Sequence, residues 1–279
     1  MKKTRYLITG GASGLGKSLA LALAKQNQAE LKICIADVND ERGEAAVKEL
    51  TNLGAEAFYQ RCDITDMQDV SELYNAVNTK WQGVDVVYNN AGVATGGSLQ
   101  SESIEQWQWI LDVNLLGMVR VSQVFLEGFK AQGHGHFVNI ASQAGLTPIP
   151  LMSSYNSVKS AVIALSETMK LELAQYNVDV SVVCPSFFKT NLDESLRTSE
   201  ASVGNLMNKL FERAKLSSDQ VAQTIVNKVN QGQFLILTHK EGIKAYRLKK
   251  LMPINWYLSM MLKQTKALLK KGQSLSREQ

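Results

Sequence analysis

The sequence predicts an α/β fold: a single doubly wound domain with a seven-stranded parallel sheet and helices on both faces. Two observations predict it. Apolar, β-rich runs alternate with amphipathic helical stretches from the first residues, and a glycine-rich loop joins the first strand to the first helix. Strands that are apolar on both sides are typical of parallel sheets, and parallel strands need crossover connections, which run right-handed.

The expected strands cover residues 5–9, 31–36, 56–61, 84–88, 136–140, 178–184 and 233–237. Helical periodicity covers residues 15–27, 40–53, 66–81, 103–132, 153–176 and 217–231. The chain shows no repeat, no low-complexity linker and no change in composition before about residue 240. We therefore expect one domain over residues 1–239, followed by a basic, amphipathic, helical extension over residues 240–279.

Charge and cysteine content narrow the class of protein. Of the 30 Lys and Arg and 26 Asp and Glu, residues 240–279 hold ten basic and two acidic side chains, a charge of +8. Residues 1–239 then carry 20 basic and 24 acidic side chains, a charge of −4. Cys34, Cys62 and Cys184 each lie in an apolar run with no Cys or His nearby, which indicates buried, reduced thiols, no metal site and a cytoplasmic location.

The glycine-rich loop runs from Thr9 to Gly16 as TGGASGLG, and it predicts a phosphate-binding turn at the start of the first helix. Glycines allow the backbone N–H groups there to approach a pyrophosphate at the positive end of the helix. Residues 11–18 also match the G-x-x-x-x-G-K-S pattern of nucleoside triphosphatases. The loop alone therefore leaves a dinucleotide enzyme and a P-loop NTPase open.

Asp37 is the first residue that separates these alternatives. It ends the second expected strand, about 20 residues beyond the glycines, where a dinucleotide fold places an acid on the adenosine ribose. A carboxylate accepts hydrogen bonds from the 2′- and 3′-hydroxyls and repels a 2′-phosphate. No basic residue stands at Ser13 or Val38 to offset it, so we expect NAD rather than NADP.

Ser142, Tyr155 and Lys159 form the expected catalytic group. Tyr155 and Lys159 are four residues apart in a helical stretch, so both lie on one face of the helix. A neighbouring ammonium favours the phenolate, and we expect it to lower the tyrosine pKa from about 10. Ser142 follows the strand at 136–140, where its hydroxyl can bind a substrate oxygen at the carboxyl end of the sheet.

Together these motifs resemble the short-chain dehydrogenase/reductase family, from residue 4 to about residue 238, and the resemblance implies a Rossmann fold. Residues 9–16 resemble its glycine motif, Asn89-Asn90-Ala91-Gly92 its NNAG motif, and Ser142, Tyr155 and Lys159 its catalytic set. The resemblance adds Asn114 to that set: it implies that Asn114 kinks its helix and that its main-chain carbonyl holds a water leading from Lys159 to solvent.

The resemblance also assigns the cofactor contacts. Asp63 and Ile64 fall where the family contacts adenine, and the segment 185–190 resembles the part that holds the nicotinamide carboxamide, with Ser186 in place of a glycine. The full expected cofactor set is Gly10, Ser13, Gly14, Leu15, Gly16, Asp37, Asp63, Ile64, Asn90, Ala91, Gly92, Tyr155, Lys159, Pro185, Phe188 and Thr190. Under this interpretation Lys17 is an exposed residue in the first helical turn.

The substrate is expected to be a lipophilic small molecule, because the loops around the site are unusually apolar. The residues concerned are Gln143, Leu146, Ile149, Leu151, Met152, Phe187, Leu192, Leu196, Leu206 and Met207. A lid that packs these residues on itself is the other possibility. The sequence thus predicts an NAD(H)-dependent oxidoreductase for secondary alcohols and ketones, with a non-catalytic dinucleotide sensor and a P-loop NTPase as alternatives.

The partners of the chain are predicted less directly. The resemblance implies a homodimer through the helices near 103–132 and 153–176. The extension after residue 240 mixes lysines with aromatic, Leu and Met side chains, which is typical of helices at a lipid interface. A helix pair closing over the substrate cleft, or a subunit contact, fits the same pattern. No motif that reads nucleic acid accompanies the charge, so no nucleic-acid partner is expected.

Overall fold

The computed structural model describes residues 4–26, 31–188, 194, 196–198, 200, 203–204 and 214–275, with side chains to residue 266. Its sheet has seven strands in the order β3-β2-β1-β4-β6-β7-β9, and every pairing is parallel. The strands are β1 (Arg5–Thr9), β2 (Lys32–Asp37), β3 (Glu56–Arg61), β4 (Val86–Asn89), β6 (Gly135–Ile140), β7 (Val178–Cys184) and β9 (Leu235–Leu237). The predicted doubly wound sheet is confirmed.

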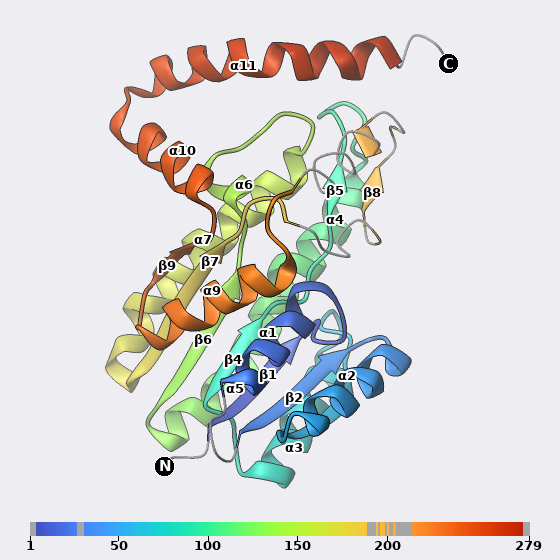
Figure 1. The fold of residues 1–279 in the computed structure, drawn as a ribbon, viewed down its shortest axis with the longest axis vertical. Coiled ribbons are helices and arrows are strands. Elements are labelled where there is room, and N and C mark those ends of the chain that lie inside the picture. The colour runs from blue at the N-terminus through green and yellow to red at the C-terminus, as the bar shows by residue number, and fades with distance from the viewer. Residues whose placement is uncertain are drawn as a thin grey trace.

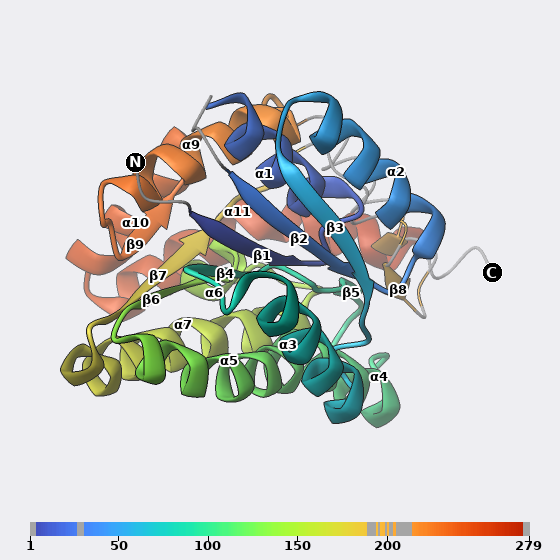
Figure 2. The same cartoon turned by 90° about the horizontal axis from the view of Figure 1, so that it is seen from below.

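Helices cover both faces of this sheet (Figure 2). One layer holds α1 (Gly14–Lys25), α2 (Asp40–Asn52) and α9 (Ser218–Asn230). The other holds α3 (Met67–Trp81), α4 (Ile104–Leu111), α5 (Met118–Gln132) and α7 (Ser153–Leu173). Each layer buries its own apolar cluster against the sheet, one centred on Leu19 and Ile225 and the other on Leu73 and Phe125.

Several elements were not predicted by the periodicity. A two-stranded parallel sheet of β5 (Thr95–Gly96) and β8 (Arg197–Thr198) forms beside the large one, and α6 (Gln143–Leu146) is a single turn. The predicted helix over 103–132 is interrupted by a π-helical turn at Asp112–Gly117. A short 3₁₀ turn, Ala174–Tyr176, follows α7.

The extension forms α10 (Lys240–Leu251) and α11 (Ile254–Leu275), and α11 crosses one end of the molecule as its outermost element (Figure 1). Among the described residues, Ile104–Gln132 is the one helical run long and apolar enough, by length and composition alone, to cross a membrane. Its buried side chains, among them Val121, Phe125 and Phe129, pack in the core between α3 and the sheet.

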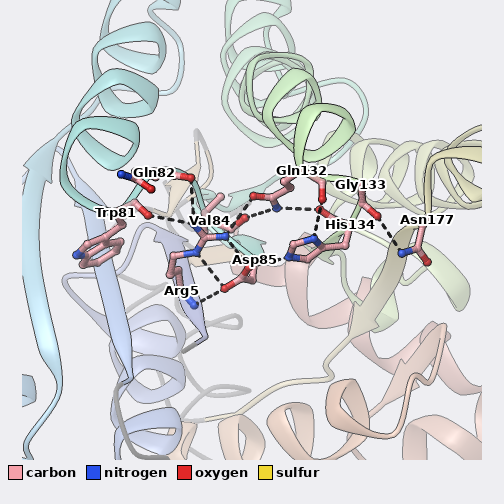
Figure 3. Close-up of polar contacts among 9 residues, drawn as sticks. All are labelled: Arg5, Trp81, Gln82, Val84, Asp85, Gln132, Gly133, His134 and Asn177. Atoms are coloured by element: carbon pink, nitrogen blue, oxygen red, sulfur yellow. Dashed lines mark hydrogen bonds and ion pairs between the residues drawn. The ribbon is translucent and has the colours of Figure 1, made fainter. Parts of the chain in front are cut away.

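An ion-pair cluster lies at the amino ends of the central strands, where β1 and β6 begin and β4 is about to begin (Figure 3). The Arg5 guanidinium donates to both carboxylate oxygens of Asp85, at 2.7 and 3.1 Å, and to the carbonyls of Trp81 and Gln82. The His134 Nε2 lies 3.0 Å from the same carboxylate. Although burial opposes the effect, the hydrogen bonds from Arg5 and His134 hold the pKa of Asp85 below its usual value.

We predict that Asp85→Asn destabilises the protein by about 3 kcal/mol, because it leaves the half-buried Arg5 without its counter-charge. Since the Asp85 pKa is lower in the folded state, its contribution is complete above the unfolded pKa of about 4 and is lost as the pH falls through the folded value. Urea unfolding at pH 7 and at pH 3 checks both points: the difference between wild type and variant should be smaller at pH 3. Glu127→Gln, which removes an exposed partner of Lys130, is the control and should change stability by less than about 0.5 kcal/mol. An equal loss in both variants would contradict the prediction.

Candidate active site

The candidate site is one cavity of about 1040 Å³ at the carboxyl ends of the central strands. Most of the residues predicted from the sequence line it: Gly10, Ser13, Gly14, Leu15, Asp37, Asp63, Ile64, Asn90, Ala91, Gly92, Ser142, Tyr155, Lys159, Pro185 and Phe188. Gly16 and Asn114 do not line the cavity and act from behind it, as described below. Thr190 lies outside the described residues.

The glycine loop has the shape that a pyrophosphate needs. Gly10 has a φ of +60°, and a Cβ there would lie 2.8 Å from the Cα of Ala91. A Cβ on Gly16 would lie 2.1 Å from the carbonyl oxygen of Gly10, so only glycine lets α1 begin this close to the loop. The N-cap residue Ser13 makes no side-chain cap, and no acid lies in the first turn of α1. The positive end of this helix therefore faces the cavity, which fits a bound diphosphate.

Lys17 and Ser18 point away from the cavity. The Lys17 ammonium pairs with Glu49 on α2, and the Ser18 hydroxyl hydrogen-bonds the Ser218 hydroxyl and the Asp219 carboxylate at the start of α9, at 2.8 and 2.7 Å. A P-loop NTPase needs this lysine on the terminal phosphates and this serine on magnesium. The geometry therefore opposes the NTPase alternative.

The NNAG segment fastens the glycine loop to β4. The Thr9 hydroxyl accepts hydrogen bonds from the N–H groups of Asn90 and Ala91, at 3.0 and 3.1 Å. In return, the Asn90 amide donates to the carbonyls of Thr9 and Gly10, at 2.9 and 3.1 Å. This segment thus sets the distance between the two strands that flank the cavity.

A buried polar chain, which the sequence did not reveal, lies behind the NNAG segment. The Asn89 amide donates to Ser122 on α5 and to Asn139 on β6, at 3.0 and 2.9 Å, and Asn139 donates to Ser166 on α7 at 3.0 Å. All four side chains are less than a tenth exposed. The chain therefore links both strands to the helix that carries Tyr155.

The adenosine end of the cavity is lined by Asp37, Arg42 and Glu194. The Asp37 carboxylate accepts from the N–H groups of Ala12 and Asn39, at 3.0 and 3.1 Å, which holds it against the glycine loop. Arg42, which the sequence analysis did not single out, pairs with Glu194 at 2.7 Å across the cavity, and that contact raises the Arg42 pKa. Its charge is thus already matched by a carboxylate.

The catalytic group lies where β6 ends and α7 begins. Tyr155 and Lys159 are both less than a tenth exposed, on the first turns of α7. The Tyr155 hydroxyl hydrogen-bonds Ser142, whose oxygen also accepts from the N–H of Ala144 at 3.1 Å. The Lys159 ammonium donates to the carbonyl of Ile140 at 2.9 Å and lies 5.8 Å from the centre of the Tyr155 ring. The structure therefore brings the three predicted side chains together.

The acidities of this group differ from the sequence-based expectation. Burial raises the pKa of Tyr155 above its usual value, and the hydrogen bond from Ser142 only partly opposes this rise. The expected lowering of the Tyr155 pKa by Lys159 is therefore wrong for the protein alone, because burial desolvates the phenolate. Burial also lowers the pKa of Lys159 to about 8, so this lysine holds its proton weakly near neutral pH.

Asn114 lies in the π-helical turn, and its side chain, rather than its carbonyl alone, has a structural role. Its amide oxygen accepts from the N–H of Val93 at 2.7 Å, and its amide nitrogen donates to the carbonyl of Val93 at 2.9 Å. It thereby pairs with a loop residue as a neighbouring strand would. This contact fixes the chain after Gly92, whose Cβ position would lie 3.0 Å from the Asn114 oxygen.

Glu102, which lies just before α4 in the chain, has a buried carboxylate that contacts the start of α7. The sequence analysis missed this residue. Its oxygens accept from the Ser154 N–H and hydroxyl, at 3.0 and 2.6 Å. A negative charge at a helix N-terminus is favourable. Because Ser154 precedes Tyr155, this contact fixes the first turn of the catalytic helix.

The far wall of the cavity comes from the apolar loops and from the extension. Gln143, Ile149, Met152 and Phe187 line it as predicted, whereas Leu192, Leu206 and Met207 lie outside the described residues. Part of the predicted set, including Leu151 and Leu196, packs in an apolar cluster around Tyr155. From the extension, the cavity is lined by Glu241, Gly242, Ala245, Leu248, Tyr257, Met260, Met261 and Gln264.

Two contacts fasten α10 to α6, the helical turn that follows Ser142. The Gln143 amide donates to the carbonyl of Gly242 at 3.3 Å, and a Cβ on Gly242 would lie 2.5 Å from the Gln143 oxygen. Lys249 donates to the carbonyl of Leu146 at 2.6 Å. A third contact joins the segment after β7 to the start of α10: the Ser186 N–H donates to the Nδ1 of His239 at 3.2 Å. Ser186 has no positive φ, so the turn does not need a glycine there.

Comparison with known proteins agrees with this site. Residues 4–201 match the family model described as short chain dehydrogenase. The chain is 32% identical over 240 residues to a putative oxidoreductase, SadH, of Mycobacterium tuberculosis, covering 85% of this chain and 86% of that one. It is 33% identical over 242 residues to a putative ketoacyl reductase of Streptomyces coelicolor, covering 86% and 88%.

Among solved structures, a short-chain dehydrogenase/reductase of Burkholderia phymatum in complex with NAD superposes with a TM-score of 0.83 at 29% identity, covering 89% of this chain and 93% of that one. The chain belongs to the short-chain dehydrogenase/reductase family, and its class is that of an oxidoreductase with a Rossmann fold.

The buried charge of Lys159 generates a prediction. The folded state lowers its pKa from about 10.5 to about 8, so at pH 7 the charged lysine destabilises the fold, and this cost disappears as the pH rises from 8 to above 10. We predict that Lys159→Met gains about 2 kcal/mol at pH 7, from about 3 kcal/mol of desolvation less about 1 kcal/mol for the lost hydrogen bond to Ile140. The gain should vanish by about pH 10, while activity is lost.

Urea unfolding at pH 7 and pH 10 measures this difference. Lys48→Met, at an exposed position of α2, is the control and should show no such dependence on pH. A Lys159→Met protein that is less stable than wild type at pH 7 would contradict the prediction.

Proposed function

We propose that this chain interconverts a lipophilic secondary alcohol and its ketone, with NAD(H) as the cofactor and Tyr155 as the acid and base. The observation that carries the proposal is the group of Ser142, Tyr155 and Lys159 at the point where the polar cofactor half of the cavity meets its apolar half. Glycine loop and catalytic group line one continuous cavity, as a hydride transfer between two bound molecules requires.

A nicotinamide dinucleotide, when bound, accepts the hydride in oxidation or donates it in reduction. Gly10, Ser13, Gly14 and Leu15 would hold its diphosphate, and Asp37 its adenosine ribose. Asp63, Ile64 and Asn90 to Gly92 would flank its adenine and nicotinamide halves, and the segment 185–188 its carboxamide.

The proton is handled by the chain's own residues. In oxidation, the Tyr155 phenolate takes the hydroxyl proton of the substrate while the hydride leaves the same carbon; in reduction, the Tyr155 hydroxyl returns the proton to the carbonyl oxygen. Ser142 can hydrogen-bond the same oxygen, because it already lies within hydrogen-bonding reach of Tyr155. The Lys159 ammonium and the positive ring of the oxidised cofactor both favour the phenolate, against the burial that raises its pKa.

The choice of NAD over NADP is supported by charge. Asp37 presents a carboxylate to the cavity, and the nearby Arg42 is paired with Glu194. A 2′-phosphate would meet one carboxylate without an unmatched cation beside it, whereas ribose hydroxyls can donate to Asp37.

A lipophilic substrate is supported by the apolar far wall, which includes Ile149, Met152, Phe187, Leu248 and Tyr257. The name of one relative, putative ketoacyl reductase, refers to a ketone carried on an acyl chain and is consistent with such a substrate. We propose in addition a homodimer through α5 and α7, which lie on the same face of the sheet (Figure 2) and where Leu171 is 81% exposed. We also propose a cytoplasmic location, since all three thiols are unpaired and buried.

Tyr155→Phe tests this function. The variant keeps the ring but loses the proton, so we expect turnover of lipophilic secondary alcohols with NAD to fall by about 10³-fold or more. NADH affinity, measured by fluorescence, should change by less than about twofold, because the hydroxyl contributes little to the cofactor site. Tyr176→Phe, at an exposed tyrosine after α7, is the control and should keep full activity.

Retained turnover in Tyr155→Phe would remove the proposed acid and base. A wild-type protein that binds NADH but turns over no alcohol or ketone in such a panel would instead support the sensor alternative.

A further inference from the structure

The outward side of α11 carries an apolar stripe that the described residues do not cover. Ile254, Leu258 and Leu262 follow one another at four-residue intervals, which places them on one face of the helix. They are 55, 50 and 66% exposed, and Leu251, just before α11, is 83% exposed. We call Leu251, Ile254, Leu258 and Leu262 the outward stripe.

The adjacent side of the same helix already has a role in the fold. Tyr257, Met260 and Met261 line the cavity, and Tyr257 is buried beneath the side chain of Lys249, whose ammonium lies 5.9 Å from the ring centre. The outward stripe lines no part of that cavity. Among the residues that the structure describes, the cavity side of α11 has apolar neighbours and the outward stripe has none.

The charges around the stripe indicate what covers it. Residues 240–266 hold seven Lys or Arg and one acid, Glu241, which pairs with Lys215. Lys263 and Lys266 are both exposed and follow the stripe along α11, one and four residues after Leu262.

We propose that α10 and α11 dock the protein on the surface of an anionic phospholipid bilayer, with the outward stripe in the interface and the basic side chains on the headgroups. Apolar burial and attraction to negative lipids act together in helices of this kind. Contact between the stripes of two copies would instead bring two clusters of seven basic residues together, which electrostatic repulsion opposes. Because α11 roofs the cavity, docking brings the cavity within about one helix diameter, some 10 Å, of the headgroups.

Vesicle binding tests this surface without reference to catalysis. The full chain is mixed with vesicles of phosphatidylcholine alone or with about one third phosphatidylserine, at about 0.1 M salt, and bound protein is measured by sedimentation. We expect binding to be at least about tenfold tighter on the anionic vesicles and to weaken at high salt.

Matched variants separate the two contributions. Lys263→Glu/Lys266→Glu should weaken binding by about tenfold or more. Lys25→Glu/Lys48→Glu, which changes one exposed lysine on α1 and one on α2, should leave binding within about twofold. Ile254→Ser/Leu258→Ser/Leu262→Ser should weaken binding to the anionic vesicles by about tenfold or more, whereas Leu53→Ser/Met67→Ser/Leu99→Ser, at exposed positions elsewhere, should leave it within about twofold. Melting temperatures of all four variants check that each one folds.

Three outcomes would overturn the proposal. The first is equal binding to both kinds of vesicle. The second is binding of the triple serine variant of α11 to anionic vesicles as tightly as the wild type. The third is a wild-type protein that binds no vesicles and whose mass in solution is larger than that of the triple serine variant. The last would assign the stripe to a contact between copies. None of them bears on the proposed reaction, which the Tyr155→Phe assay tests separately.

Discussion

The contact between the ends of β1 and β4 governs the position of the rest of the site. Thr9 and Asn90 hold these neighbouring strands through four hydrogen bonds that use the side chain of each residue against the backbone of the other strand. The glycine loop leaves one strand and the NNAG segment leaves the other, so their spacing is the width of the cofactor half of the cavity. The backbone of Gly16 packs directly on the carbonyl of Gly10, with no room for a Cβ between them. A shift of either strand would therefore move the start of α1 as well.

The catalytic half of the site concentrates groups that are costly to bury. Lys159 is charged at neutral pH yet almost fully buried, and its ammonium donates a hydrogen bond to the carbonyl of Ile140. Such a cost is tolerated in proteins where the charge is needed by the chemistry. The neighbouring elements are correspondingly fixed: Glu102 holds the first turn of α7, and the chain from Asn89 to Ser166 links α7 to the sheet. In the proposed reaction, this rigidity around the buried charge would keep the proton donor and the substrate oxygen aligned.

The sequence could predict the sheet and the residues of the cofactor half, because both depend on local patterns. Alternating apolar runs mark the strands, and each loop that enters the site directly follows one of them. The contacts missed were those between distant segments. Nothing near Asn114 signals that its amide pairs with Val93, and nothing near Gly242 signals that it packs on Gln143. The acidity of Tyr155 was misjudged for the same reason, since burial is a property of the packed fold. The role of residues 240–266 as a wall of the cavity was open among several alternatives, because an amphipathic pattern fixes which faces are apolar but not what each face meets.

The cavity is proposed to bind a dinucleotide that carries ribose hydroxyls rather than a further phosphate. The most direct test is to titrate the purified protein with NADH, NADPH and Mg-ATP in turn and to follow its melting temperature. A ligand that binds the native state stabilises it by mass action, by about 2.7 kcal/mol at a hundred times its dissociation constant. The account predicts that NADH raises the melting temperature at concentrations where NADPH and Mg-ATP do not. A response to NADPH alone would contradict the role given to Asp37, and a response to Mg-ATP alone would contradict the function itself.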